Sequence, residues 1–117
     1  MKQVVKNVAT MMKAGDQKPS LASANLHRSL INEEYSEWLH AHNVVEEVDA
    51  CLDLIWVCTG YMLSLGVDVT GAWNEVAASN RSKTMPDGKC LKDENGKILK
   101  PEGYFKPDLK PFIPVNF

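Results

Sequence analysis

Carboxylates are concentrated in two short stretches of the chain, residues 33–37 and 46–53. Six of them recur at spacings that suit an α-helix: Glu33, Glu34, Glu37, Glu46, Asp49 and Asp53. Burying an ionised carboxylate without a partner is costly, and the two helices predicted to carry these acids contain only one basic side chain, Arg28. Acids that converge without cations favour a divalent metal, and oxygen ligands favour Mg²⁺ or Mn²⁺ over zinc.

Four of the acids are the predicted metal ligands. Glu34 and Glu37 fall inside the apolar arc of the helix predicted over about 20–41. Asp49 and Asp53 lie one turn apart in the following helix, which is otherwise apolar. The alternative for a single glutamate on a helix is a solvated surface position, and this alternative is strongest for Glu33.

Apolar side chains at helical spacing predict four helices, over residues 2–14, about 20–41, about 44–65 and about 68–79. Ser20 or Ser23 is expected to cap the second helix, and Asp68 or Thr70 to start the fourth. After Lys83 the chain is rich in proline and glycine, and the DG and NG dipeptides that bracket Lys89 to Glu94 predict a small hairpin there. The predicted fold class is all-α, a four-helix bundle with an irregular C-terminal tail, in one domain over residues 1–117.

The third predicted helix is apolar on nearly every side, which is typical of a helix at the centre of a bundle or an interface. A chain of 117 residues has too few helices to cover both sides of it. We therefore expect an obligate homo-oligomer.

The bulk properties exclude several classes of partner. The net charge of −2 gives no general attraction to nucleic acid or to an anionic membrane. No stretch approaches the roughly 18 apolar residues of a membrane span, and we expect a cytoplasmic protein. Three cysteines without a CxxC motif indicate neither a disulfide framework nor a zinc site.

The histidines are weaker candidates. His40 and His42 are two residues apart and fall on different sides of a helix, so a shared metal is not expected. His27 lies on the apolar arc two turns before Glu34, and we expect a hydrogen-bonded histidine in the core.

Several motifs, in this order, resemble the all-α nucleoside triphosphate pyrophosphohydrolases, which include MazG-like and phosphoribosyl-ATP pyrophosphohydrolase-like proteins of bacteria and phages. The residues that carry the resemblance are the EExxE box at 33–37, the helix EEVDACLDLIWV, the SNRSK segment and GYFKPDL in the tail. One departure stands in the second acidic box, where Ala50 precedes Asp53 by three residues and the literal ExxD is Glu46 to Asp49.

The resemblance implies hydrolysis of a (deoxy)nucleoside triphosphate to monophosphate and pyrophosphate, in a dimer or tetramer. Two or more Mg²⁺ or Mn²⁺ ions would be held by Glu34, Glu37, Asp49 and Asp53, with either Glu46 or Asp49 as the substitute for the missing acid. Glu33 or Glu46 would act on the attacking water, and Asn80 and Lys83 would contact the phosphates.

Branch similarity gives a weak preference for deoxypurine triphosphates, dGTP first, in the dNTP pool of a bacterial or phage-infected cytoplasm. The alternative substrates are dUTP, dCTP and phosphoribosyl-ATP. The alternative outside enzymes is a helical interaction module. A di-iron protein is not expected, because that class uses ExxH pairs, which the chain lacks.

Overall fold

The computed structural model describes residues 1–116, and these residues form helices, turns and irregular segments without a strand. The elements are α1 (Lys2–Ala14), α2 (Leu21–Leu39), α3 (Val44–Ser64), α4 (Val69–Arg81) and a short 3₁₀ helix η1 (Lys110–Phe112). The all-α prediction is confirmed, and each predicted helix appears within a few residues of its expected bounds.

Three polar side chains define where the helices begin. Ser20 caps α2, Asn43 caps α3 and Asp68 caps α4, and each accepts a hydrogen bond from the backbone N–H three residues further on, at 3.1, 2.9 and 3.1 Å. Such caps satisfy N–H groups that have no partner inside the helix.

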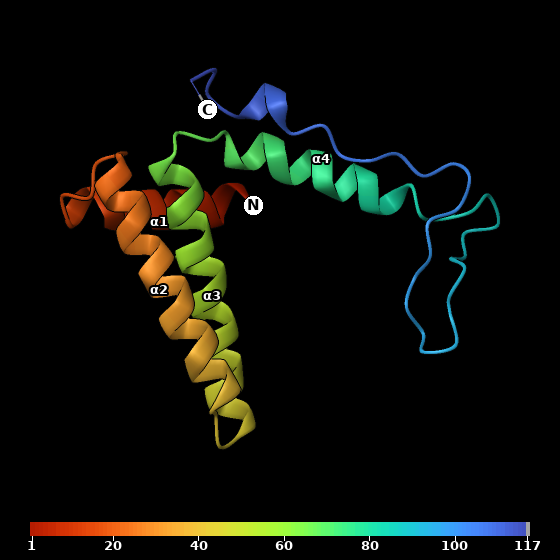
Figure 1. The fold of residues 1–117 in the computed structure, drawn as a ribbon, viewed down its shortest axis with the longest axis horizontal. Helices are drawn as coiled ribbons and strands as arrows, with labels where there is room; N and C mark the ends of the chain where they lie inside the picture. Colours follow the sequence, from red (N-terminus) through yellow and green to blue (C-terminus); the bar gives the residue numbers. More distant parts are fainter. Residues whose placement is uncertain (117) are drawn as a thin grey trace.

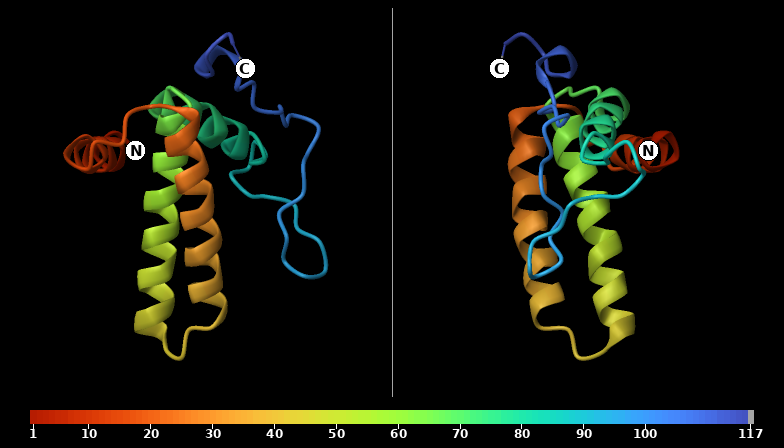
Figure 2. Two further views of the ribbon diagram at one scale, coloured as in Figure 1. Left: turned by 60° about the vertical axis from the view of Figure 1, so that its left-hand side comes forward. Right: turned by 90° about the vertical axis from the view of Figure 1, so that its right-hand side faces the viewer.

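The arrangement of the helices differs from the predicted bundle. Helices α2 and α3 form an antiparallel pair, α1 crosses α3, and α4 leaves α3 at a bend of 118° (Figures 1 and 2). Within residues 1–116, α2 contacts neither α1 nor α4, so one chain does not close a four-helix bundle. The bend follows Gly66, whose φ of 78° ends α3, and the Asp68 N–H then donates to the Phe112 carbonyl at 2.9 Å.

A histidine packed against a glycine fixes the spacing of α2 and α3. His27 is 3% exposed, as the apolar pattern predicted, and a methyl group built at Gly60 would overlap Cδ2 and Nε2 of its imidazole. The backbones of the two helices therefore approach closely only because residue 60 has no side chain. Glu34 and Asp53 each lie seven residues, about 10 Å, further along the same two faces.

Buried hydroxyl groups orient this histidine. Ser64 Oγ donates to the Gly60 carbonyl at 2.8 Å, and Ser23 Oγ lies 2.7 Å from Ser64 Oγ. His27 Nδ1 lies 2.8 Å from the Ser23 carbonyl, which can only accept, so Nδ1 carries a proton. Ser23 Oγ, Ser64 Oγ and His27 Nδ1 thus each have a hydrogen-bond partner, which offsets the cost of burying them between two helices.

The C-terminal tail runs back along α4. Ser79 Oγ donates to the Phe105 carbonyl at 2.8 Å, and the Phe105 N–H donates to Ser82 Oγ at 3.1 Å. The predicted hairpin over Lys89 to Glu94 is wrong. The DG and NG dipeptides form two separate turns, each closed by one isolated bridge, Thr84 to Cys90 and Lys92 to Ile98.

One chain buries few apolar side chains. Its buried hydrophobic residues are Val8, Met12, Ala24, Ala50, Val57 and Val69, whereas the three tryptophans are 38–50% exposed. The radius of gyration is 16.9 Å, against about 13 Å for a compact chain of this length. In residues 1–116 no single helix is long and apolar enough to cross a membrane, and only the bent pair α3 and α4 passes that test jointly.

Replacing Gly60 by alanine tests the helix spacing. We expect Gly60→Ala to lower the free energy of unfolding by about 1–3 kcal/mol, because the new methyl group overlaps the His27 ring and forces the helices apart. Gly103→Ala is the matched control, since no atom lies within 4 Å of a methyl group there. Urea unfolding followed by circular dichroism measures both variants. Equal stabilities of the two variants would contradict the packing described.

Candidate active site

Carboxylates from α2 and α3 meet along the line where the two helices pack. Glu34 interacts electrostatically with Glu37 on its own helix and with Asp53 on α3, and Asp53 interacts with Asp49 and Glu37. We call these four acids the carboxylate seam. The structure therefore brings together the four residues that the sequence proposed as metal ligands.

Only acidic neighbours, and no basic side chain of the described residues, act on the pKa values of Glu34 and Asp53. Desolvation by burial, then a side-chain hydrogen bond with Glu37, and then the charges of Glu37 and Asp53 raise the pKa of Glu34 from 4.5 to about 7. Burial and the carboxylate of Asp49 raise the pKa of Asp53 as well. Arg28, the only nearby basic residue in sequence, donates instead to the Tyr61 hydroxyl at 2.8 Å.

The seam fits a hard divalent cation in its donor chemistry. Oε2 of Glu34 is buried and has no hydrogen-bond partner, and the surrounding donors are carboxylate oxygens, the ligands that Mg²⁺ and Mn²⁺ prefer. The side chains do not form a finished ligand set, because in the described part of the chain no three His, Cys, Asp or Glu residues converge on one point. The carboxylates would therefore have to rotate toward a bound ion.

The two acids predicted to act on water occupy different surroundings. Oε2 of Glu46 accepts the His42 backbone N–H at 3.1 Å, while the Glu46 N–H is held by Asn43, so Glu46 belongs to the cap of α3. Glu33 is exposed and adds its charge to that acting on Glu34. Of Glu46 and Asp49, only Asp49 lies close enough to raise the pKa of Asp53.

Ala50, at the position where the resemblance implies an acid, is 3% exposed. A carboxylate at this position would have to be buried.

The two predicted phosphate contacts lie elsewhere in the chain. Asn80 is exposed near the end of α4, and Lys83 follows that helix. Helix α4 points away from the α2–α3 pair and makes no contact with α2 in the described residues, so its C-terminal end lies apart from the seam of its own chain (Figure 1).

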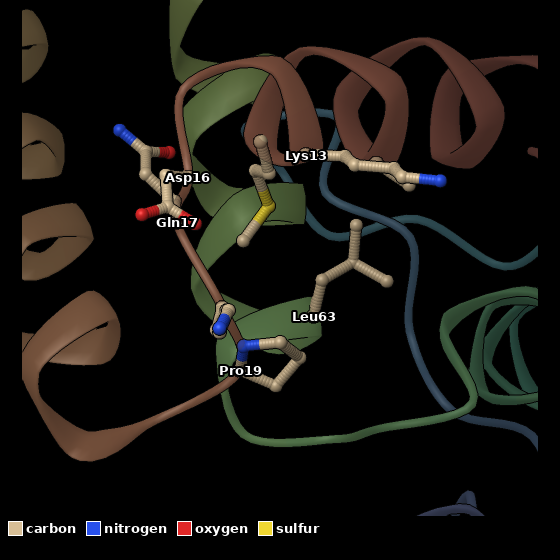
Figure 3. Close-up of a pocket in the computed structure, with 8 residues that line it drawn as sticks. Lys13, Asp16, Gln17, Pro19 and Leu63 are labelled. Carbon is tan, nitrogen blue, oxygen red and sulfur yellow. The ribbon is translucent and has the colours of Figure 1, made fainter.

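Two cavities differ in their relation to the seam. The larger, about 460 Å³, lies between α1, the connection after it and Leu63 of α3, and Figure 3 shows its Pro19 and Leu63 side chains. Leu63 is ten residues from Asp53, about 15 Å along α3, so this apolar cavity does not serve the acids.

A second cavity, of about 340 Å³, opens at the turn between α2 and α3. Its lining includes Glu37 and Asp49 of the seam together with His40 and His42. His40 Nδ1 donates to the Ser36 carbonyl at 2.7 Å, which leaves Nε2 as the free nitrogen. The position of His40 and His42 in the turn between two acidic helices is the sequence signal that places them beside the seam.

The fold and seam define an all-helical protein with acidic residues facing one another across an antiparallel helix pair. The chain belongs to the phosphoribosyl-ATP pyrophosphohydrolase family, whose model matches residues 5–80. This family consists of pyrophosphohydrolases, which act on nucleotide acid anhydrides. Comparison with curated proteins finds no relative that matches the chain.

The pKa of Glu34 predicts how the stability of the metal-free protein depends on pH. The pKa is raised in the folded state, so protonated Glu34 stabilises the fold at acid pH, and this contribution is lost as the pH rises through about 7. We expect the melting temperature in EDTA to be lower at pH 8 than at pH 5.5. Glu34→Gln should reduce this difference and raise the melting temperature at pH 8.

Glu102→Gln, at an exposed carboxylate in the tail, is the control and should leave the pH profile of the parent unchanged. An identical pH dependence in Glu34→Gln and the parent would contradict the electrostatics of the seam.

Proposed function

We propose that this chain hydrolyses a (deoxy)nucleoside triphosphate to the monophosphate and pyrophosphate, using Mg²⁺ or Mn²⁺ held by the carboxylate seam. The observation that carries the proposal is the buried, unpartnered Oε2 of Glu34 among carboxylates that have no cation near them. Membership of a pyrophosphohydrolase family supports the reaction class.

Glu34, Glu37, Asp49 and Asp53 would hold the metal, with two or more ions in each site. A bound divalent ion neutralises charge on the phosphates and lowers the pKa of a water molecule. Glu33 is our candidate for accepting the proton from the water whose oxygen attacks phosphorus, as the anhydride bond breaks and pyrophosphate leaves. It is exposed and free of a capping hydrogen bond, whereas Glu46 is held by the turn before α3.

The proposed substrate class is the deoxypurine triphosphates, dGTP first, and this choice comes from branch similarity alone. The competing substrates are phosphoribosyl-ATP, dUTP and dCTP. Turnover across all dNTPs and NTPs and phosphoribosyl-ATP, with products separated by ion exchange, distinguishes them. Unchanged substrates throughout would favour the interaction-module alternative.

We further propose that the protein is a homo-oligomer. One chain exposes 8605 Å² of surface, whereas a compact monomer of 13.0 kDa exposes about 6,300 Å². The excess, about 2,300 Å² for each subunit, is in the range that obligate subunit interfaces bury. Val45, Val48, Leu52 and Ile55 supply an apolar stripe along α3, each at least 50% exposed in one chain.

Substitutions in the seam test the catalytic assignment. Glu34→Gln and Asp53→Asn should each reduce Mg²⁺-dependent pyrophosphate release by about 100-fold or more, because each removes a charge that would hold the ion. Both variants should remain folded by circular dichroism, and Glu102→Gln should keep the activity of the parent. Normal turnover by either seam variant would show that the metal lies elsewhere.

Light scattering tests the oligomer. At micromolar concentration the parent should have the mass of a dimer or tetramer. Val48→Asp combined with Leu52→Asp should lower this mass, because each carboxylate would have to be buried in the interface. Asp substitutions at the exposed positions Lys6 and Thr10, which like Val48 and Leu52 are four residues apart on one helix, form the control. A monomeric parent would refute the proposal.

A further inference from the structure

Two short turns of the C-terminal tail are built alike. In residues 85–89 and 93–97, the N–H of the first residue donates to the carbonyl of the fifth, at 2.8 and 2.9 Å. The fourth residue of each turn is a glycine, Gly88 or Gly96, with a φ of 82°. The residue before this glycine is Asp87 in the first turn and Asn95 in the second. The two turns therefore place different side chains at the same position.

Asn95 differs from the other asparagines of the chain in its neighbour and in its surroundings. It is the only one of the eight asparagines that a glycine follows. Asn95 and Gly96 are both exposed, and no atom lies within 4 Å of a methyl group built at Gly96. No side chain therefore crowds the approach of the Gly96 backbone nitrogen to the Asn95 amide.

Most of the other asparagines lie inside helices. In a helix the backbone N–H of the following residue is held by the carbonyl four residues earlier, which keeps that nitrogen away from the asparagine side chain. The asparagines placed in this way in α1, α2 and α4 are Asn7, Asn25, Asn32, Asn74 and Asn80.

The carboxylate of Asp93 holds the turn around Asn95 closed. Its Oδ1 accepts the backbone N–H groups of Asn95 at 2.8 Å and of Lys97 at 2.9 Å. The Asp93 carbonyl accepts the Gly96 N–H at 3.1 Å. The pairing beside the turn is short, an isolated bridge from Lys92 to Ile98, so the turn can open locally and the bonds to Asp93 oppose its opening.

We propose that Asn95 is a site of spontaneous deamidation, at a rate that Asp93 sets by holding the turn closed. When the turn opens, the Gly96 nitrogen loses its proton and attacks Cγ of Asn95. The bond from Cγ to Nδ2 breaks, and the amide nitrogen takes up that proton and leaves as ammonia. Water then opens the resulting succinimide ring at one of its two carbonyl carbons, which leaves either aspartate or isoaspartate.

Asp87, at the matching position of the first turn, is protected by its chemistry and by its contact. A carboxylate is a weaker electrophile than an amide, so the attack of the Gly88 nitrogen on Asp87 is slower. The Asp87 side chain is also engaged, because its Oδ1 accepts the Lys89 N–H at 2.9 Å. The first turn is therefore an internal comparison for the second.

Deamidation changes both the charge and the backbone of the turn. Residues 92–97 contain two lysines and two acids, so one added carboxylate takes their net charge from zero to −1. Isoaspartate also inserts a methylene into the backbone between residues 95 and 96. Asp93 Oδ1 can then no longer hold the N–H groups of residues 95 and 97 at their present spacing. This inference does not depend on the proposed function.

Mass spectrometry of the full-length protein tests the site. The parent is kept at pH 8 and room temperature for two weeks and then digested. We expect the peptide that contains Asn95 to gain the mass that accompanies replacement of NH₂ by OH, and an isoaspartyl methyltransferase to label it. The peptides that contain Asp87 or the helical asparagines should not be labelled, and Asn95→Gln should abolish the labelling. Asn95 that stays intact in the parent would overturn the proposal.

Two substitutions at Asp93 test the control of the rate by the turn. Asp93→Ala removes the acceptor of two backbone N–H groups and should speed the deamidation of Asn95 by about 3-fold or more. Asp93→Asn keeps an acceptor oxygen at the same place and should react as slowly as the parent. Equal rates in Asp93→Ala and the parent, or equal acceleration by both substitutions, would refute the role assigned to Asp93.

Discussion

Burial at the packing line of α2 and α3 disfavours an ionised carboxylate, and the acidic residues that face one another there disfavour it further. Glu34 shows the consequence most clearly, because burial and its acidic neighbours raise its pKa to about 7 and its Oε2 has no hydrogen-bond partner. The rest of the α2–α3 pair maintains this arrangement. The His27 ring against Gly60 sets the distance between the helices, and the serine layer around it holds the ring in place.

Two features of a single chain bear on its association with a second copy. It buries only small apolar side chains, apart from Met12, and leaves the stripe on α3 in solvent. The lysines that follow α4 also lie beyond a bend of 118° between α3 and α4, away from the acids of the α2–α3 pair (Figure 1). The exposed stripe is what the proposed homo-oligomer would bury, because a second copy of the chain would cover it.

Local patterns in the sequence predicted the helices and the seam well. Residue spacing on a helix is fixed by helix geometry, so the spacing alone placed Glu34, Glu37, Asp49 and Asp53 on facing sides of two helices. The sequence left two choices for the N-cap of α2 and of α4. The structure shows Ser20 rather than Ser23 at the first, and Asp68 rather than Thr70 at the second. His27 is the buried, hydrogen-bonded histidine expected from its position.

Long-range contacts account for what the sequence could not predict. The direction of α4 depends on Gly66 and on the contact of Asp68 with Phe112, more than forty residues away. The bundle expected within one chain therefore fails, and Asn80 and Lys83 lie far from the seam. The role of Glu46 could not be decided from sequence, because an acid three residues after Asn43 can either complete a helix cap or bind a metal ion. The DG and NG dipeptides predicted turns, but not that they would form two turns rather than one hairpin.

Binding of Mn²⁺ tests most directly whether the seam is a metal site. The electron paramagnetic resonance signal of free Mn²⁺ is followed as parent protein is added at pH 7.5 without nucleotide. We expect the signal to fall in a saturable way, with at least one ion bound for each chain, and to remain unchanged when Glu34→Gln and Asp53→Asn are combined. Mn²⁺ that stays free in the presence of the parent, or binds equally well to the double variant, would contradict the central claim.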